Sequence, residues 1–168
     1  MSNSYVDVIE QAISLLDDIS LADYQEVLAP HFSSSIGAHV RHIVDHFLAL
    51  KQASINGEIN YTKRNRHGDV EQFPYAAIAL CESINAWLKE TCSSQLLNQS
   101  VLVTTDIDIS HTKSPTCEST LERELVFVAS HAIHHYALIR IIRNMQGKAL
   151  PEFFGYAPAT ITYITRSV

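Results

Sequence analysis

The chain has 168 residues, enough for one domain with a buried core, and we expect a single domain over residues 1–168. Apolar residues make up 46% and charged residues 18% of the chain, which is a globular composition rather than a disordered one. The formal net charge of −6 argues against a general affinity for nucleic acid or for anionic membrane surfaces.

The sequence carries no recognisable export or membrane signal. No apolar run approaches the ~20 residues of a membrane span, and the start (MSNSYVDVIEQ) has neither the basic residues nor the apolar stretch of a secretory signal. Cys81, Cys92 and Cys117 form no Cys-x-x-Cys pair, and three cysteines cannot all be joined in disulfides. These features predict a reduced, cytoplasmic protein without membrane or nucleic-acid partners.

Hydrophobic periodicity predicts four long helices. The second begins after a serine N-cap at residues 33–35, and the fourth begins after Ser119 or Thr120 and is closed by Gly147. We expect these helices at residues 4–19, about 36–54, 75–91 and about 120–146. The architecture predicted from them is an all-α four-helix bundle.

The connections between these helices differ in character. Residues 55–69 contain Asn-Gly and His-Gly breaks and are typical of a long loop. Residues 101–109 alternate between apolar and polar side chains and are rich in β-branched ones, and residues 113–118 contain a proline. We therefore expect a short hairpin or irregular insertion before the last long helix. We expect strands nowhere outside residues 100–118. A last helical turn or two is predicted from Pro158.

Histidine is the unusual residue, because six of the nine fall in two short segments. The second predicted helix contains His39, His42 and His46, and the fourth contains His131, His134 and His135. His131 and His135 are four residues apart, so their rings project side by side from one helix face. With a third imidazole from the second helix they would form a three-histidine site for a divalent metal, with open positions for water or substrate.

Other interpretations of these histidines remain open. A single histidine on an apolar helix face is usually a core or surface residue, and the His-x-x-x-His spacing also arises by chance. Two clusters on inward faces favour a metal site, because burying several unpaired imidazoles costs free energy at each. His42 and His46 have the same four-residue spacing, so periodicity does not decide which of them is the ligand.

The segments IGAHVRHIVDHF and SHAIHHYALI, together with the closing FGYAPATITYI, resemble the DinB superfamily, which includes the YfiT-like metal-dependent hydrolases. The resemblance implies an up-down-down-up four-helix bundle. It also implies a zinc, nickel or iron ion held by His42, His131 and His135. The sequence departs from the family pattern in its additional His46 and His134, which are alternate ligands or neighbours of the ligands. Replacing any of the three ligands should release the metal, whereas His39, His46 and His134 should be dispensable for holding it.

Four further residues are candidates for supporting roles. Asp45 is placed to accept the second ring N–H of His42, or else to be a solvated carboxylate or a partner of Arg41. Glu124 is a candidate base or extra ligand, or else a carboxylate favoured by the helix dipole. Arg64 and Arg66 belong to a basic loop and could hold a substrate carboxylate or phosphate, or simply be solvated.

The leading functional hypothesis is a metal-dependent enzyme. Three neutral imidazoles leave the ion its full charge, so a bound water or thiol loses its proton more readily. Hydrolysis follows in the first case and transfer of a small thiol in the second, which several members of the resembled family carry out. The alternatives are a metal-binding stress or sensor protein without turnover, and a bundle that binds no metal. No small-molecule substrate is identified by the sequence.

A homodimer is also expected, because small bundles of the resembled family often pair. The aromatic residues predicted to be exposed, and so to form the interface, are Trp87, Phe153 and Phe154.

Overall fold

The structure is a computed structural model that describes residues 4–63, 68–92, 95–107 and 114–166. Its body consists of four long helices: α1 (Ser4–Asp17), α3 (Ile36–Asn56), α5 (Pro74–Thr91) and α6 (Leu121–Met145). The shorter elements are α2 (Leu21–Gln25), β1 (Glu58–Asn60), α4 (Gly68–Gln72), η1 (Gln95–Asn98), β2 (Ser100–Thr104), β3 (Thr116–Thr120) and α7 (Pro158–Arg166). The four predicted long helices are therefore present.

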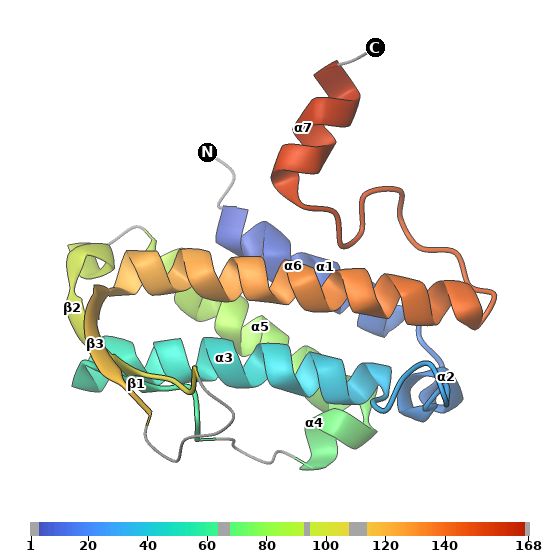
Figure 1. Cartoon of the computed structure of the whole chain (residues 1–168), viewed down its shortest axis with the longest axis horizontal. Coiled ribbons are helices and arrows are strands. Elements are labelled where there is room, and N and C mark those ends of the chain that lie inside the picture. Colours follow the sequence, from blue (N-terminus) through green and yellow to red (C-terminus); the bar gives the residue numbers. More distant parts are fainter. Residues whose placement is uncertain (1–3, 64–67, 93–94, 108–113, 167–168) are drawn as a thin grey trace.

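The long helices pack through apolar stripes. In Figure 1, α1 lies against α5 and α3 lies against α6, while α3 also contacts α5 and α1 contacts α6. The inward stripe of α3 contains Val40, Ile43, Phe47 and Leu50, each no more than 1% exposed. Since burying one such side chain contributes about 1.5–3 kcal/mol, these stripes supply most of the driving force that joins the helices.

The sequence signals for the helix ends are confirmed. The Ser35 hydroxyl accepts the amide N–H of Ala38 at 3.2 Å, and α3 ends at Gly57 with φ +75°. The Thr120 hydroxyl caps α6 in the same way, and the chain turns away at Gly147 with φ +71°. Side-chain caps satisfy amide groups that have no partner within the helix, and a positive φ favours glycine.

A three-stranded mixed sheet overturns the predicted fold class. Strand β1 pairs parallel with β2, which pairs antiparallel with β3. Across the described ranges the chain has this sheet and seven α-helices, so the predicted all-α four-helix bundle with a hairpin or irregular insertion is wrong. The expectation of strands only within residues 100–118 is also wrong, because β1 lies at Glu58–Asn60. The expected insertion does form β2 and β3, although residues 108–113 lie outside the described part. Strand β1 lies in the predicted loop, where three residues are too few to show alternation.

The sheet closes one end of the helical body. Strand β1 directly follows α3 and β3 directly precedes α6, so these two helices run antiparallel with the sheet at the end where α3 stops and α6 starts (Figure 1). The sheet residues Ile59, Val101 and Val103 are buried. The sheet thereby fixes how far α3 and α6 are offset along their common axis, which decides which of their side chains meet.

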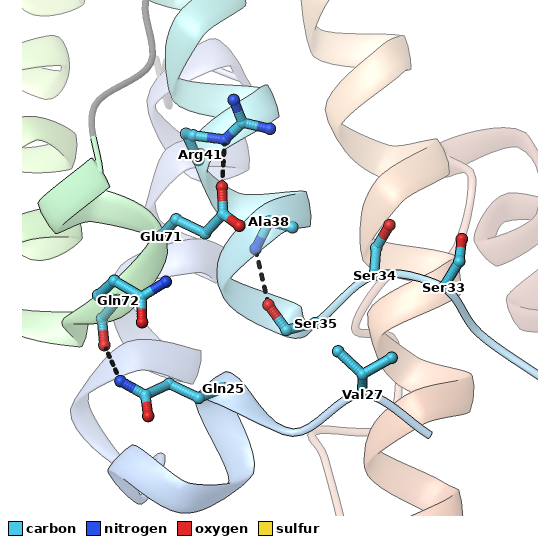
Figure 2. Close-up of a pocket in the computed structure, with 9 residues that line it drawn as sticks. All are labelled: Gln25, Val27, Ser33, Ser34, Ser35, Ala38, Arg41, Glu71 and Gln72. Carbon is cyan, nitrogen blue, oxygen red and sulfur yellow. Dashed lines mark hydrogen bonds and ion pairs between the residues drawn. The ribbon is translucent and has the colours of Figure 1, made fainter. Parts of the chain in front are cut away.

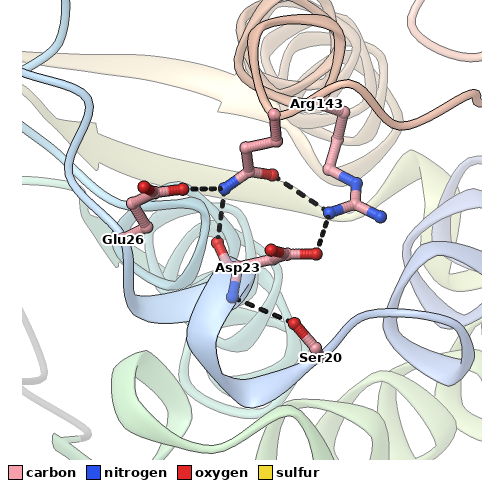
Figure 3. A network of polar contacts seen from close by, with 5 residues as sticks. Ser20, Asp23, Glu26 and Arg143 are labelled. Atoms are coloured by element: carbon pink, nitrogen blue, oxygen red, sulfur yellow. Dashed lines mark hydrogen bonds and ion pairs between the residues drawn. The ribbon is translucent and has the colours of Figure 1, made fainter.

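A polar network at the opposite end ties α2 to α6 (Figure 3). Arg143, whose side chain is 7% exposed, donates from Nη1 to Asp23 Oδ2 at 2.9 Å. Gln146 Nε2 donates to the carbonyl oxygen of Asp23 and to the carboxylate of Glu26. Helices α2 and α4 were not predicted, because five residues are too few for a helical period to be recognised.

The segment after α6 returns to the body before α7 begins. Gly155 has φ +70°, and a Cβ there would lie 2.7 Å from the carbonyl carbon of Tyr136. Helix α7 confirms the helical turns predicted from Pro158, and none of its residues is buried. Trp87 and Phe154 are buried in the core, 8% and 4% exposed, so the prediction that they are exposed interface residues is wrong.

By length and composition alone α6 could cross a membrane, contrary to the expectation that no segment reaches this threshold. A helix from the core of a globular protein passes the same test. The helix lies in the body, with its stripe Leu121, Leu125, Val128 and Ala132 at most 1% exposed, so we draw no membrane assignment from it.

Candidate metal centre

Three of the predicted histidines converge between α3 and α6. His131 and His135 are one turn apart on α6, and His42 faces them from the antiparallel α3. One ring nitrogen from each lies within 4.8 Å of the others, and all three side chains are partly buried. The structure therefore brings together the three residues predicted as ligands, and neither alternate belongs to this group.

The ring nitrogens are spaced as ligands of one ion would be. His131 Nε2 is 3.0 Å from His42 Nε2 and 3.2 Å from His135 Nε2. If each nitrogen were about 2.0–2.1 Å from a shared ion, these separations would correspond to nitrogen–metal–nitrogen angles of about 90–105°. Such angles fall between octahedral and tetrahedral values, so the spacing suits several metals.

Burial favours the neutral form of two of these imidazoles, His131 and His135. Burial, followed by the neighbouring His46 and His134, lowers the pKa of His131 to about 4. Burial, followed by the nearby histidines, lowers the pKa of His135 to about 3. A neutral imidazole has a free nitrogen lone pair, which is the form that binds a metal. Near neutral pH no proton competes for these lone pairs.

The two alternates have different surroundings. The Nδ1 of His46 is 2.9 Å from the carbonyl oxygen of His42, to which it donates, and its ring stacks on Tyr61 with centroids 5.0 Å apart. The ring of His134 is 6.4 Å from that of His131, centroid to centroid. Both histidines are therefore close neighbours of the cluster without a nitrogen in the converging group.

His39 contacts the cluster from the side away from that group. Its Nδ1 is 2.9 Å from Nδ1 of His135, the ring nitrogen opposite the converging Nε2. Its own Nε2 is buried and has no hydrogen-bond partner among the described residues. Burial, followed by His134, lowers the pKa of His39.

The two carboxylate candidates have different surroundings. Asp45 shares the lining of a small cavity with His42 and His46. Arg41, the alternative partner expected for Asp45, pairs through its Nε with Glu71 at 2.9 Å.

Glu124 is 2% exposed and is held by three donors rather than aimed at the cluster. It accepts from the Tyr61 hydroxyl at 3.0 Å, the Ser119 hydroxyl at 2.7 Å and Arg123 Nη1 at 2.9 Å. These bonds join the sheet end of the body to α6 and make Glu124 a structural anchor there. Arg64 and Arg66 lie outside the described residues.

Tyr61 is the contact residue that the sequence did not indicate. Its ring stacks on His46 and its hydroxyl reaches Glu124, so it links the histidines to the sheet. It follows β1 directly, in the segment predicted to be a loop. No spacing rule marks a lone tyrosine there.

An apolar cavity of about 280 Å³ lies beside the cluster, between β2–β3 and α6. Tyr61, Val103 and Phe127 contribute to its wall, and the Phe127 ring stacks on that of His131 with centroids 5.8 Å apart. A ligand in this cavity would be separated from the histidines by one aromatic ring.

A polar cavity of about 370 Å³ at the start of α3 is a weaker candidate (Figure 2). Several of its polar groups already bind one another: Arg41 with Glu71, Gln25 with the carbonyl of Gln72, and Ser35 with the amide of Ala38. None of the histidines lines it. We therefore place the candidate site at the histidines despite the larger volume here.

Comparison with known proteins finds one informative similarity. No family model matches the chain. FK506-binding protein 5 of Rhizopus delemar is 35% identical over 117 residues, which is 70% of this chain and 30% of that protein. The chain thus spans about a third of the relative's length, and the name describes a considerably longer protein.

This comparison corrects the expected family and activity. The relative is named for FK506 binding rather than as a DinB-like protein, and no DinB model matches, so the predicted membership of that superfamily is wrong. The predicted activity as a metal-dependent hydrolase or thiol transferase rested on that resemblance and is overturned with it. The three histidine positions and their ion are tested by neither comparison and stay predictions.

Proposed function

We propose that the chain binds one divalent cation through Nε2 of His42, His131 and His135. The observation that carries the proposal is the spacing of these nitrogens, 3.0 and 3.2 Å from the central one. Without a cation, each short contact between two nitrogens needs one hydrogen between them, and His131 Nε2 takes part in both. A cation would satisfy all three lone pairs at once.

The chain's own contribution to such a site is positional. The antiparallel helices α3 and α6 aim the rings from opposite sides, and the apolar stripes below them hold the helices together. Three neutral imidazoles suit zinc, nickel, copper and iron(II), and leave positions open for further ligands. Zinc is the most convenient first probe because it is redox-inert. The proposal concerns binding and assigns no reaction.

The test is elemental analysis of untagged protein, combined with zinc titration after chelator treatment. We expect close to one zinc per chain for the wild type, and for the matched variants His46→Ala and His134→Ala. His42→Ala, His131→Ala and His135→Ala should each lose most of the affinity, because each deletes one ligand. Retention of zinc by all three of these variants would place any bound ion elsewhere.

The similarity to the Rhizopus protein favours a second candidate, binding of FK506 or of a related apolar ligand. The apolar cavity beside Phe127 is the described feature that suits it best, and its 280 Å³ is close to the lower limit for ligand pockets. Titration with FK506, followed by amide chemical shifts, should then perturb β2, β3 and the first turns of α6. A titration that leaves the amide chemical shifts unchanged and releases or absorbs no heat in calorimetry removes this candidate.

A further inference from the structure

The imidazole of His39 forms a second layer behind the proposed ligand His135. The two Nδ1 atoms are 2.9 Å apart, a hydrogen-bond distance that admits one hydrogen between them. A neutral imidazole carries its hydrogen on one ring nitrogen, and the other nitrogen accepts. The pair therefore has two neutral arrangements, which differ in the nitrogen of His135 that remains free.

Only one arrangement is compatible with a ligand at His135 Nε2. In that arrangement His135 Nδ1–H donates to His39 Nδ1, the hydrogen of His39 is on its Nε2, and the lone pair of His135 Nε2 faces His131 and His42. In the other arrangement His39 donates, and the hydrogen on His135 Nε2 points at His131 Nε2, 3.2 Å away. A hydrogen there blocks the ligand position.

We propose that His39 is a positioning residue that selects the metal-binding tautomer of His135. The inference rests on the proposed cation site and adds the residue that prepares one of its ligands. His39 is suited to this role because its Nδ1, when it carries no hydrogen, can accept from Nδ1 of His135, the proposed ligand whose opposite nitrogen faces the cluster. Groups that accept the second ring hydrogen of a metal-ligating histidine fix its tautomer and its orientation.

The burial of His39 bears on why an imidazole, rather than an apolar side chain, stands at this position. In the selected arrangement its Nε2–H is buried, with no hydrogen-bond partner among the described residues. An unsatisfied buried donor of this kind typically costs about 1–3 kcal/mol. A leucine at this position would fill similar space without that cost, so packing alone does not account for the imidazole. The contact with His135 does.

Two substitutions separate the acceptor from the bulk. His39→Leu keeps the size and removes the acceptor, whereas His39→Asn places an amide oxygen near the position of Nδ1. Although the sequence alone led us to expect His39 to be dispensable, its contact with His135 predicts that His39→Leu lowers zinc affinity by about 10–100-fold, the usual effect of losing such a partner. His39→Asn should stay within a few-fold of the wild type, as should His134→Leu, the matched control that removes a neighbouring imidazole from α6.

The tautomers themselves can be read from the zinc-loaded wild type by ¹⁵N NMR of the histidine rings. We expect the hydrogen of His135 on Nδ1 and that of His39 on Nε2. The reverse assignment overturns the inference even if the variants do not fold. Equal zinc affinity of wild type and His39→Leu also overturns it and leaves the cation site intact. Absence of zinc uptake by the wild type overturns the cation site and this inference together.

Discussion

Replacing His131 with alanine should abolish the stabilisation of the fold by zinc. In the proposed site His131 is the central ligand, since its Nε2 makes both short contacts in the cluster, at 3.0 and 3.2 Å. A ligand that binds only the folded chain stabilises it by about 2.7 kcal/mol at a free concentration 100 times its dissociation constant. For a chain of 168 residues this corresponds to a rise in Tm of about 5–10 °C.

The assay is thermal unfolding of chelator-treated protein, scanned with and without zinc. Wild type and His134→Ala should show the full rise in Tm, and His131→Ala should show little or none at the same zinc concentration. Comparing each protein with its own metal-free state removes the effect of the substitution on the fold itself. The reasoning is refuted if His131→Ala gains as much Tm from zinc as the wild type.

Three further predictions concern the fold without metal. Because burial lowers the pKa of His131 to about 4 and of His135 to about 3, the unfolded chain takes up these protons first as the pH falls. The contribution of these two histidines to the free energy of unfolding is therefore complete above about pH 6.5 and is lost towards pH 4 and below. Urea unfolding with the same midpoint at pH 7 and pH 4 would contradict this. An alanine in the left-handed conformation costs about 1–2 kcal/mol, and Gly155→Ala should destabilise the fold by more, because its Cβ would also meet the backbone of α6. Thermal unfolding measures the difference against Gly57→Ala, where the same backbone conformation has open space around the Cβ. Arg143→Met should lower the free energy of unfolding by about 1.5–3 kcal/mol through loss of its bond to Asp23. An unchanged free energy of unfolding in urea would show that the pair does not stabilise the fold.

The sequence was informative wherever a pattern repeats within one helix. The four-residue spacing of His131 and His135 requires only helical geometry, and in the structure both rings lie beside His42. The serine and threonine caps and the glycine that closes the last long helix, Gly147, are similarly local signals. These features depend on residues a few positions apart, which is why composition and periodicity were enough to find them.

Contacts between distant residues were not predictable in the same way. The bond between His39 and His135 joins positions 96 apart, and it depends on the offset between α3 and α6. That offset is set partly by the sheet, whose strand β1 has only three residues and gave no signal. Tyr61 reaches His46 and Glu124 for the same reason. The family expectation failed differently, because it extended short histidine motifs to a whole fold and an activity.

The most direct test of the cation site is anomalous diffraction from crystals of the wild-type chain grown with zinc, measured on both sides of the zinc absorption edge. The proposal predicts one strong peak per chain, about 2.0–2.1 Å from Nε2 of His42, His131 and His135. Clear density for the three rings with no anomalous peak between them, or with a peak bound by other residues, would contradict it.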